Sequence, residues 1–307
     1  MRFHGVMMVR DEADIVGETI RGLMTWLDAL HVLDTGSTDG TREVLRGLAA
    51  ADRRVSIIDD VCGGGPLEFA NNLRGVIFER AKGTFEDGDW VGRLDADEFY
   101  HESPRAWLAA NVRPWEGAVY AQMYEFMVTH REAADWEAGR EGAADRARSV
   151  QWRRRRYAIE PVVELRLFRY RRGMRWMWES SRPLYAGVPA AARIPVRHYR
   201  WRDPEQMRRR CVLRSVMTRR VDTGVHWSKS DWREWLWDDL DPRLLRWTPG
   251  EALPFRSDVN HLKPWLRRWA QRAFYAVGGA RVTAPWRDVG VFEARALAAE
   301  VDAAVRV

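Results

Sequence analysis

Three acidic residues follow a short, mostly apolar stretch near residue 95. The stretch Trp90–Leu94 predicts a strand, and Asp95, Asp97 and Glu98 come directly after it. Asp95 and Asp97 are two residues apart, so on an extended backbone their side chains point to the same side. Carboxylates are the ligands that hard divalent cations such as Mg²⁺ and Mn²⁺ prefer. The pattern therefore indicates a cation site, although the same spacing occurs twice more in the chain in polar surroundings.

Apolar segments alternate with helix-like patterns throughout the first hundred residues. This alternation predicts an α/β fold with a mostly parallel sheet and helices on both faces. In such sheets ligands bind beyond the carboxyl ends of the strands, where the strand order reverses. If the order is 3-2-1-4, the loops at 10–12 and 95–98 flank one crevice, with the loop at 34–37 beside them. The expected strands lie at 3–9, 31–33, 55–58 and 90–94.

The second part of the chain is less regular. Residues 119–129 and 163–170 alternate in polarity and predict two further strands. Residues 131–156 are charged and end in an arginine run, which predicts a surface insertion that is either solvated or a lid for phosphate or acceptor. We expect a catalytic domain at 1–222, with a nucleotide-binding half at 1–100 and an acceptor-side half at 101–222. A helical extension rich in tryptophan and arginine is expected at 223–307.

Composition narrows the protein class. The chain has 307 residues and a net charge of +6, which suits phosphate-bearing ligands, anionic membranes or nucleic acid. No apolar run reaches the roughly 18 residues of a membrane span. A strand that begins at Phe3 leaves no room for a leader segment, and the two cysteines are far apart, so we expect a cytoplasmic protein. An amphipathic pattern at 261–278 allows peripheral contact with the inner face of a membrane, although docking on the catalytic domain is the favoured interpretation.

Six segments of the chain form a recognisable series: Val9–Ile15, Leu33–Thr41, Arg74 before Lys82–Gly83, Leu94–Phe99, Arg166–Arg169 and His198–Gln206. Taken in this order, they resemble family 2 glycosyltransferases with the GT-A fold, in particular the bacterial group that includes lipopolysaccharide-core glucosyltransferases. The resemblance covers about residues 3–215, and the last ninety residues resemble nothing in this family.

The resemblance implies an inverting, metal-dependent transfer from a nucleotide-diphosphate sugar to a hydroxyl of a glycan, a lipid-linked acceptor or a small natural product. A bound Mn²⁺ or Mg²⁺ would neutralise the diphosphate leaving group. Asp97 would coordinate the metal, Asp95 would face the ribose or a metal-bound water, and His198 would be a third ligand. Arg74 would contact the phosphates or the base. The nucleoside pocket would be lined by Arg10, Asp11, Glu12, Asp34, Thr35 and Ser37.

The general base and the nucleotide base stay open at this point. Family members place a His-Glu pair where Trp178-Glu179 stands here, so Glu179 is the first candidate for the group that takes the acceptor proton. Glu98, Glu160 and Glu164 are alternatives. Family members often carry a second aspartate where Thr35 stands, and that aspartate can read uracil, so its absence leaves the base undefined.

Three other classes compete with this interpretation. A nucleotidyltransferase shares the sheet and the metal chemistry, but a glycine-rich, arginine-bearing loop would follow its first strand, and residues 10–17 lack one. A nucleic-acid-binding protein would suit the basic charge, but the acidic loop in the main crevice would repel a phosphate backbone. A catalytically inactive GT-A-like binding protein is disfavoured by the presence of Arg74, Asp95 and Asp97.

Overall fold

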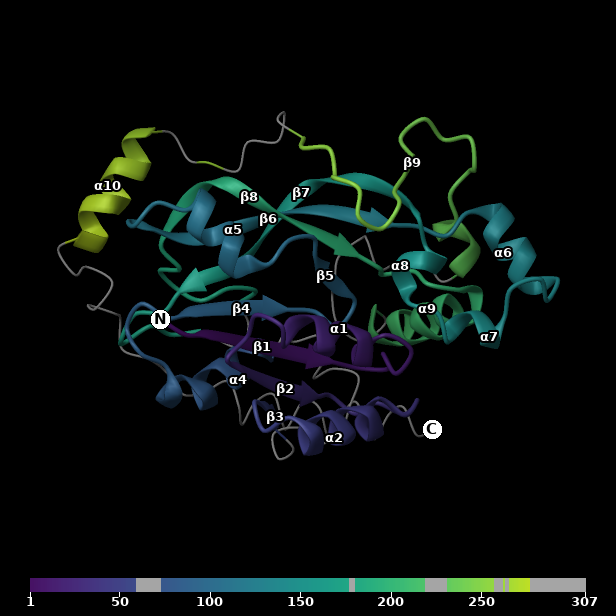
Figure 1. Cartoon of the computed structure of the whole chain (residues 1–307), viewed down its shortest axis with the longest axis horizontal. Helices are drawn as coiled ribbons and strands as arrows, with labels where there is room; N and C mark the ends of the chain where they lie inside the picture. Colours follow the sequence, from purple (N-terminus) through teal and green to yellow (C-terminus); the bar gives the residue numbers. More distant parts are fainter. Residues whose placement is uncertain (59–72, 177–179, 219–230, 257–261, 263–264, 277–307) are drawn as a thin grey trace.

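A computed structural model describes residues 1–58, 73–176, 180–218, 231–256, 262 and 265–276. Within these ranges one mixed sheet has the strand order β3-β2-β1-β4-β7-β6-β8-β5, and β9 pairs with β7 (Figure 1). The glycine-rich sequence at 63–66, Glu179 and the chain after 276 lie outside the described residues. The strands are β1 Phe3–Val9, β2 Ala29–Asp34, β3 Val55–Ile57, β4 Trp90–Leu94, β5 Glu98–Tyr100, β6 Glu116–Phe126, β7 Arg156–Arg169, β8 Val188–His198 and β9 Leu245–Arg246.

The first four strands are all parallel and stand in the order 3-2-1-4, as the alternating sequence pattern predicts. The α/β class is therefore confirmed. Helices cover this half of the sheet on both faces, because alternate residues of a strand point to opposite sides. The helices are α1 Val16–Leu23, α2 Thr41–Ala51, α4 Arg74–Ala81, α5 Pro104–Asn111, α6 His130–Glu137, α7 Ala143–Arg146, α8 Val150–Arg153, α9 Pro204–Thr218 and α10 Trp265–Ala276, with 3₁₀ turns at Lys82–Thr84 and Trp232–Trp235.

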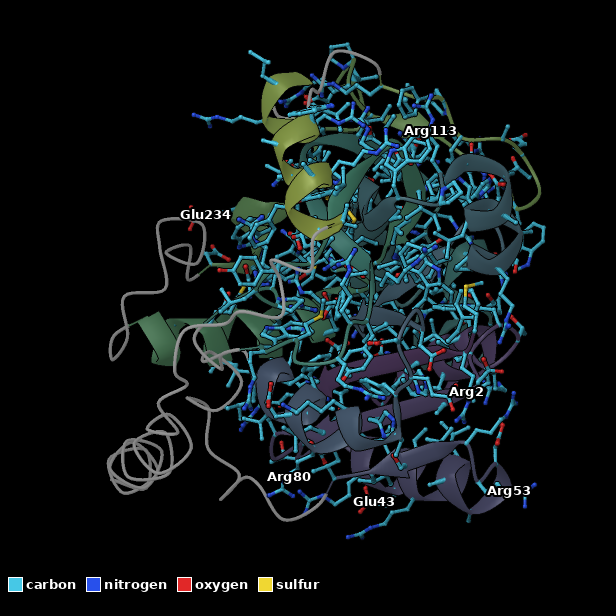
Figure 2. All side chains as sticks on the ribbon, turned by 90° about the vertical axis from the view of Figure 1, so that its left-hand side faces the viewer. Arg2, Glu43, Arg53, Arg80, Arg113 and Glu234 are labelled. Carbon is cyan, nitrogen blue, oxygen red and sulfur yellow. The ribbon has the colours of Figure 1, made fainter. Side chains whose placement is uncertain are left out.

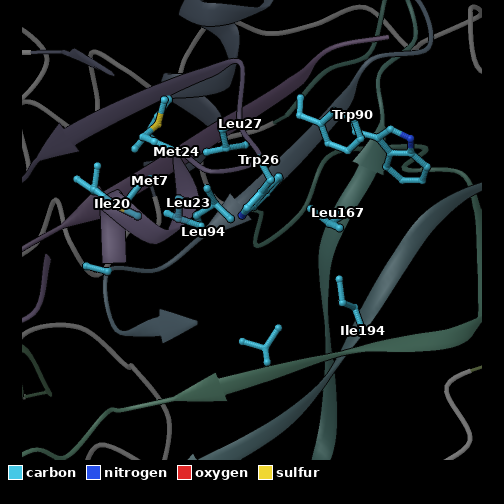
Figure 3. Packing of buried hydrophobic residues seen from close by; sticks show 14 of the residues in the cluster. Met7, Ile20, Leu23, Met24, Trp26, Leu27, Trp90, Leu94, Leu167 and Ile194 are labelled. Carbon is cyan, nitrogen blue, oxygen red and sulfur yellow. The ribbon is translucent and has the colours of Figure 1, made fainter. Parts of the chain in front are cut away.

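Two apolar layers hold the helices to the sheet. On one face α1 packs its buried side chains, Ile20 and Leu23 among them, against Met7 of β1 and Leu94 of β4 (Figure 3). On the other face α4 packs against Val6 and its neighbours in the sheet. Each fully buried apolar side chain of this size contributes about 1.5–3 kcal/mol to folding. These layers therefore hold β1 and β4, and the loops that follow them, in place.

The backbone of β1 is crowded at Gly5. A Cβ atom at this position would lie 2.6 Å from Leu94 Cδ1 and 2.7 Å from Leu30 Cδ1, closer than real contacts allow. Glycine therefore lets the side chains of β2 and β4 close over the centre of β1. The close fit keeps β1 and β4 at a fixed spacing.

The second half of the sheet curls. Strand β5 follows β4 after only three residues, yet it pairs with β8 at the far edge of the sheet, four strand positions from β4. Four spacings in a flat sheet would cover about 19 Å, whereas the connection from Leu94 to Glu98 spans at most about 14 Å. The sheet must therefore curl back, and Figure 1 shows β5 lying between β4 and the strands β6 and β8.

The segment at 131–156, for which we expected a surface insertion, contains most of α6 and the short helices α7 and α8. Thr129 and Glu132 form a capping box at the start of α6, in which each side chain accepts from the other residue's backbone N–H. The arginine run is not solvated, because Arg153 is 8% and Arg154 only 1% exposed. Arg154 reaches Glu141 and the carbonyl of Arg202. These arginines fasten the insertion to the domain.

Residues 231–256, which we call the tail segment, are mostly irregular, with turns, a 3₁₀ turn and the two-residue strand β9, and are not α-helical as expected. They lie along the ends of β6 and β7, where Leu245 pairs with Tyr157. Helix α10 packs against β8. Charged side chains such as Glu43, Arg53 and Arg80 lie at the periphery of the molecule (Figure 2). Within the part of the chain that the structure describes, no helix has the length and apolar character needed to cross a bilayer.

Candidate active site

The acidic loop between β4 and β5 is held from three sides. The hydroxyl of Thr19 on α1 donates to the carbonyl of Ala96 at 2.5 Å. The N–H of Tyr199 donates to the carbonyl of Asp97 at 2.8 Å. Glu98 stands opposite His198 in the antiparallel register of β5 and β8. The loop conformation is therefore set by α1 and β8 as well as by its own sequence.

Asp97 and His198 lie together at the carboxyl ends of β4 and β8. His198 Nε2 is 3.3 Å from Asp97 Oδ1, and His198 Nδ1 is 2.6 Å from Glu125 Oε1. Burial alone would lower the pKa of the imidazole, but the carboxylates of Glu125 and Asp97 outweigh it and raise the pKa of His198 to about 10. In this conformation the ring is protonated at neutral pH and donates to both carboxylates.

A second group of charges reaches Asp97 from α9. Arg210 Nη1 donates to Asp97 Oδ2 at 3.0 Å and to Glu12 Oε1 at 3.1 Å. Burial opposes ionisation of Asp97, but His198 and Arg210 outweigh it and hold the pKa of this carboxyl well below its usual range. Glu12 also accepts from Arg202 at 2.5 Å. The loops after β1 and β4 are thus joined by guanidinium groups.

Asp95 faces a different set of arginines. It accepts from Arg74 of α4, and Arg166 Nη2 of β7 lies 3.4 Å from its second oxygen. Burial would raise its pKa, but Arg74, Arg166 and Arg93 lower the pKa of Asp95 below its usual range. Arg74 is only 8% exposed. The expected proximity of Arg74 to the acidic loop is present, and Arg93 and Arg166 add two further cations there.

The loop after β2 is stabilised by its own side chains. Asp34 Oδ1 accepts from the N–H groups of Gly36 and Ser37 and from the Ser37 hydroxyl at 2.7 Å. The N–H of Asp11 donates to Ser37 Oγ at 2.9 Å. Asp11 has a positive φ of 52°, a conformation in which aspartate is tolerated. These bonds join the loops after β1 and β2, as the 3-2-1-4 order predicts.

The other two residues expected at the nucleoside have largely buried side chains. Thr35 is completely buried, and its hydroxyl donates to the carbonyl of Val9 at 3.2 Å. Arg10 donates to the carbonyl of Thr35 at 2.6 Å, and its side chain is only 8% exposed. In this conformation Thr35 and Arg10 support the loop from the protein interior, and a ligand would meet Asp11 and Ser37 first.

The candidate bases occupy unlike surroundings. Glu179 lies outside the described residues. Glu98 is 2% exposed and paired with Arg166. Glu164 is 2.9 Å from Arg93, and the charge of Arg166 lowers the pKa of Glu164 to about 2. The side chain of Glu160 makes no ion pair with a described residue and accepts one long hydrogen bond, from the N–H of Val162 at 3.4 Å.

Two of the three predicted metal ligands have donor atoms that suit one divalent cation. A carboxylate oxygen and an imidazole nitrogen, as on Asp97 and His198, are ligands that Mn²⁺ accepts, provided that the ring is neutral. Asp95 is turned toward Arg74 and Arg166. Consequently, among the described residues no three acidic or histidine side chains surround one position. Asp97 and His198 fit the metal as a pair, and the full predicted trio is not assembled in this conformation.

Four residues of the site were not predicted as functional from the sequence. They are Glu125, which holds His198, and the arginines 166, 202 and 210, which pair with the acids. Arg166 stands in a segment that the sequence analysis singled out, but nothing in its spacing indicates a pairing with Glu98. Arg210 is one of three consecutive arginines at 208–210, and only the rotation of α9 selects it.

Comparisons with known proteins place the chain beside glycosyltransferase structures at low similarity. No protein-family model and no curated protein matches the sequence. A mannosyltransferase from Pyrobaculum calidifontis, solved with GDP-Man and Mn²⁺, aligns at 15% identity over 99% of this chain and 75% of its own, with a TM-score of 0.31. A glucosyl-3-phosphoglycerate synthase from Mycobacterium tuberculosis, solved with Mn²⁺ and UDP-Glc, aligns at 23% identity over 40% of this chain and 44% of its own, with a TM-score of 0.25.

Proposed function

We propose that this protein is an inverting, metal-dependent glycosyltransferase that moves a sugar from a nucleotide-diphosphate sugar to a hydroxyl acceptor. The observation that carries the proposal is the contact of Asp97 with His198, 3.3 Å apart at the carboxyl ends of β4 and β8. Asp97 lies on the loop that follows β4, next to β1, where the sheet order reverses, and His198 is the last residue of β8. Such a position is where α/β sheets bind nucleotides.

The leaving group of this reaction is a nucleoside diphosphate, whose developing negative charge must be neutralised. A divalent cation bound by Asp97 and His198 would supply that neutralisation as a Lewis acid. Arg74 pairs with Asp95, the first residue after β4, and would contact the phosphates directly. Asp95 pairs with Arg74 and Arg166 and so holds both guanidinium groups at the acidic loop.

The nucleoside end of the donor would lie over the loops after β1 and β2. Asp11 and Ser37 bind each other through backbone and side chain there, which keeps polar groups at fixed positions. Glu12 holds Arg210 beside Asp97 and so contributes to the charge balance of the site. Asp34 and Thr35 shape the loop.

Direct binding of nucleotides tests the proposal. We expect one of UDP, GDP, dTDP and CDP to bind in the presence of Mn²⁺ and to lose most of its affinity in EDTA, because the cation bridges the diphosphate to the protein. Titration calorimetry with all four, in both conditions, measures this. Absence of binding by every nucleotide would contradict the proposal, and RNA binding that falls steeply with salt would favour a nucleic-acid partner instead.

Glu179 is our proposed general base, by its place in the sequence. Replacing it with glutamine is expected to lower turnover by about 10²–10⁴-fold, because the amide cannot take the acceptor proton. Donor affinity should change by less than about twofold. The measurements are steady-state rates and calorimetric donor binding. Glu137→Gln, at an exposed acid on α6, is the control. A large loss of donor binding in Glu179→Gln would place Glu179 in the donor pocket instead.

A further inference from the structure

A cavity of about 540 Å³ lies between the sheet and the tail segment. Strands β6 and β7 form one wall, and residues of the tail segment form the other. The volume falls in the range of small-molecule sites, roughly 300–1,000 Å³. Most of the lining is apolar, and it includes Met127, Ala158, Ile159, Pro161, Trp237 and Leu245.

The tail wall is fixed to the sheet by backbone bonds. The N–H of Trp237 donates to the carbonyl of Val128, and the carbonyl of Trp237 accepts from His130 at 3.0 Å. Further along, β9 pairs with β7, and the hydroxyl of Tyr124 donates to the carbonyl of Pro254 at 2.8 Å. The half-buried indole of Trp237 therefore has a defined position at the cavity, as a binding site requires.

One residue, Glu125, connects the cavity with the proposed metal ligands His198 and Asp97. Glu125 lines the cavity, and its Oε1 accepts from His198 Nδ1 at 2.6 Å. His198 in turn contacts Asp97. A molecule in the cavity would thus lie one side chain away from the proposed donor site. This separation suits the second substrate of a transfer reaction better than a part of the donor.

The cavity lining holds no excess of cations. Its charged residues are two acids, Glu125 and Glu160, and two arginines, Arg243 and Arg256. Arg243 is already paired with Asp241 at 2.7 Å. A strongly anionic acceptor would need additional cations. Carboxylates next to an aromatic ring instead match a sugar, whose C–H face packs on the indole while its hydroxyls donate to the acids. The guanidinium of Arg243 lies over the indole of Trp237 at 4.8 Å, and a sugar that packs on that face would take its place.

We propose that this cavity is the acceptor subsite and that it takes a neutral pyranoside, which packs on Trp237 and hydrogen-bonds to Glu160. The assignment rests on the proposed glycosyltransferase function. It also gives the tail segment a role, because Trp237 and Leu245 come from it. No part of the cavity belongs to the loops assigned to the donor.

Saturation-transfer NMR on the full chain tests this assignment. The probes are the methyl pyranosides of glucose, galactose and mannose, with glucose 6-phosphate as an anionic counterpart, each with the diamagnetic ion Mg²⁺ and the preferred nucleotide. We expect a neutral pyranoside to bind the wild type and Trp115→Ala, whose ring lies at the opposite end of β6. Binding should weaken about tenfold in Trp237→Ala through loss of the stacked ring. The isosteric Glu160→Gln should weaken it as well, without any change in packing.

The outcomes separate the two proposals, because nucleotide binding is measured on the same variants. Nucleotide binding by all variants, with pyranoside binding lost only in Trp237→Ala and Glu160→Gln, supports the acceptor subsite. Preference for glucose 6-phosphate, or equal pyranoside binding by all variants, overturns it. Failure of every neutral pyranoside to bind while nucleotides do bind also overturns it. Pyranoside binding without nucleotide binding would keep a sugar site and overturn the transferase.

Discussion

Asp97→Ala is expected to lower sugar transfer by about a thousandfold or more while the protein stays folded. Among the described residues, Asp97 alone pairs with both His198 and Arg210 of α9. Its removal would take away a proposed metal ligand and unbalance the charges around the diphosphate. Mn²⁺-dependent nucleotide binding should be lost together with transfer. Steady-state rates and calorimetry measure the two effects.

The fold should survive because both partners of Asp97 keep another acid. His198 retains Glu125, and Arg210 retains Glu12. We expect the variant to lose stability by about 3 kcal/mol, at the low end for breaking a buried ion pair. The acids of this loop therefore do not simply repel one another, because Asp95, Asp97 and Glu98 each pair with an arginine.

Asp89→Ala is the matched control. Asp89 is 1% exposed and lies at the opposite end of β4, where it accepts from His4 Nε2 and from the N–H of Arg2. This variant should lose a similar amount of stability and keep transfer near the wild-type rate. Equal losses of transfer in both variants would mean that the effect of Asp97 is structural. Wild-type transfer in Asp97→Ala would rule out its role as a metal ligand.

Arg202→Met is expected to lower the free energy of unfolding by about 3–5 kcal/mol. Arg202 is fully buried and makes a two-bond contact with Asp14, at 2.7 and 2.8 Å, as well as a bond to Glu12. Burial raises the pKa of Asp14, but Arg202 outweighs this and lowers it below its usual value. Methionine fills the space but leaves Asp14 buried without its cation. Urea unfolding at neutral pH measures the loss.

Arg140→Met controls for the loss of an arginine in general. Arg140 pairs with Asp135 at 2.6 Å, but its side chain is 64% exposed. Pairs of this kind contribute less than about 1 kcal/mol, because water screens them. Equal shifts of the urea midpoint in Arg140→Met and Arg202→Met would show that the buried network around Arg202 does not stabilise the protein.

The first half of the fold was predictable because its signals are local. Apolar runs of five to seven residues, such as Phe3–Val9 and Trp90–Leu94, fix the buried strands, and their alternation with helices predicts parallel order. The 3-2-1-4 order then follows from a small number of known topologies. The capping box at Thr129 is a local signal too, and it would have predicted α6 in place of a loop.

The charge pairing was not predictable, because partners are far apart in the sequence. Glu12 and Arg202 are 190 residues apart, and His198 and Glu125 are 73 apart. The sequence does not distinguish a charged side chain that is exposed to solvent from one that is buried in an ion pair. For this reason the burial of Arg153 and Arg154 was not predicted. The conformation of the tail segment was not predicted, for a related reason. Its strand β9 is only two residues long and exists through its pairing with β7.

The three-residue connection between β4 and β5 has a thermodynamic consequence. His198 ends β8 and Asp97 follows β4, and the curl of the sheet brings them together. A ligand that binds both residues would therefore join β4 and β8, which are three positions apart in the strand order, as well as occupy a site. Since the unfolded chain lacks this juxtaposition, such a ligand would stabilise the folded chain, by about 2.7 kcal/mol at a concentration one hundred times its Kd. Substrate supply and the lifetime of the folded protein would then be linked.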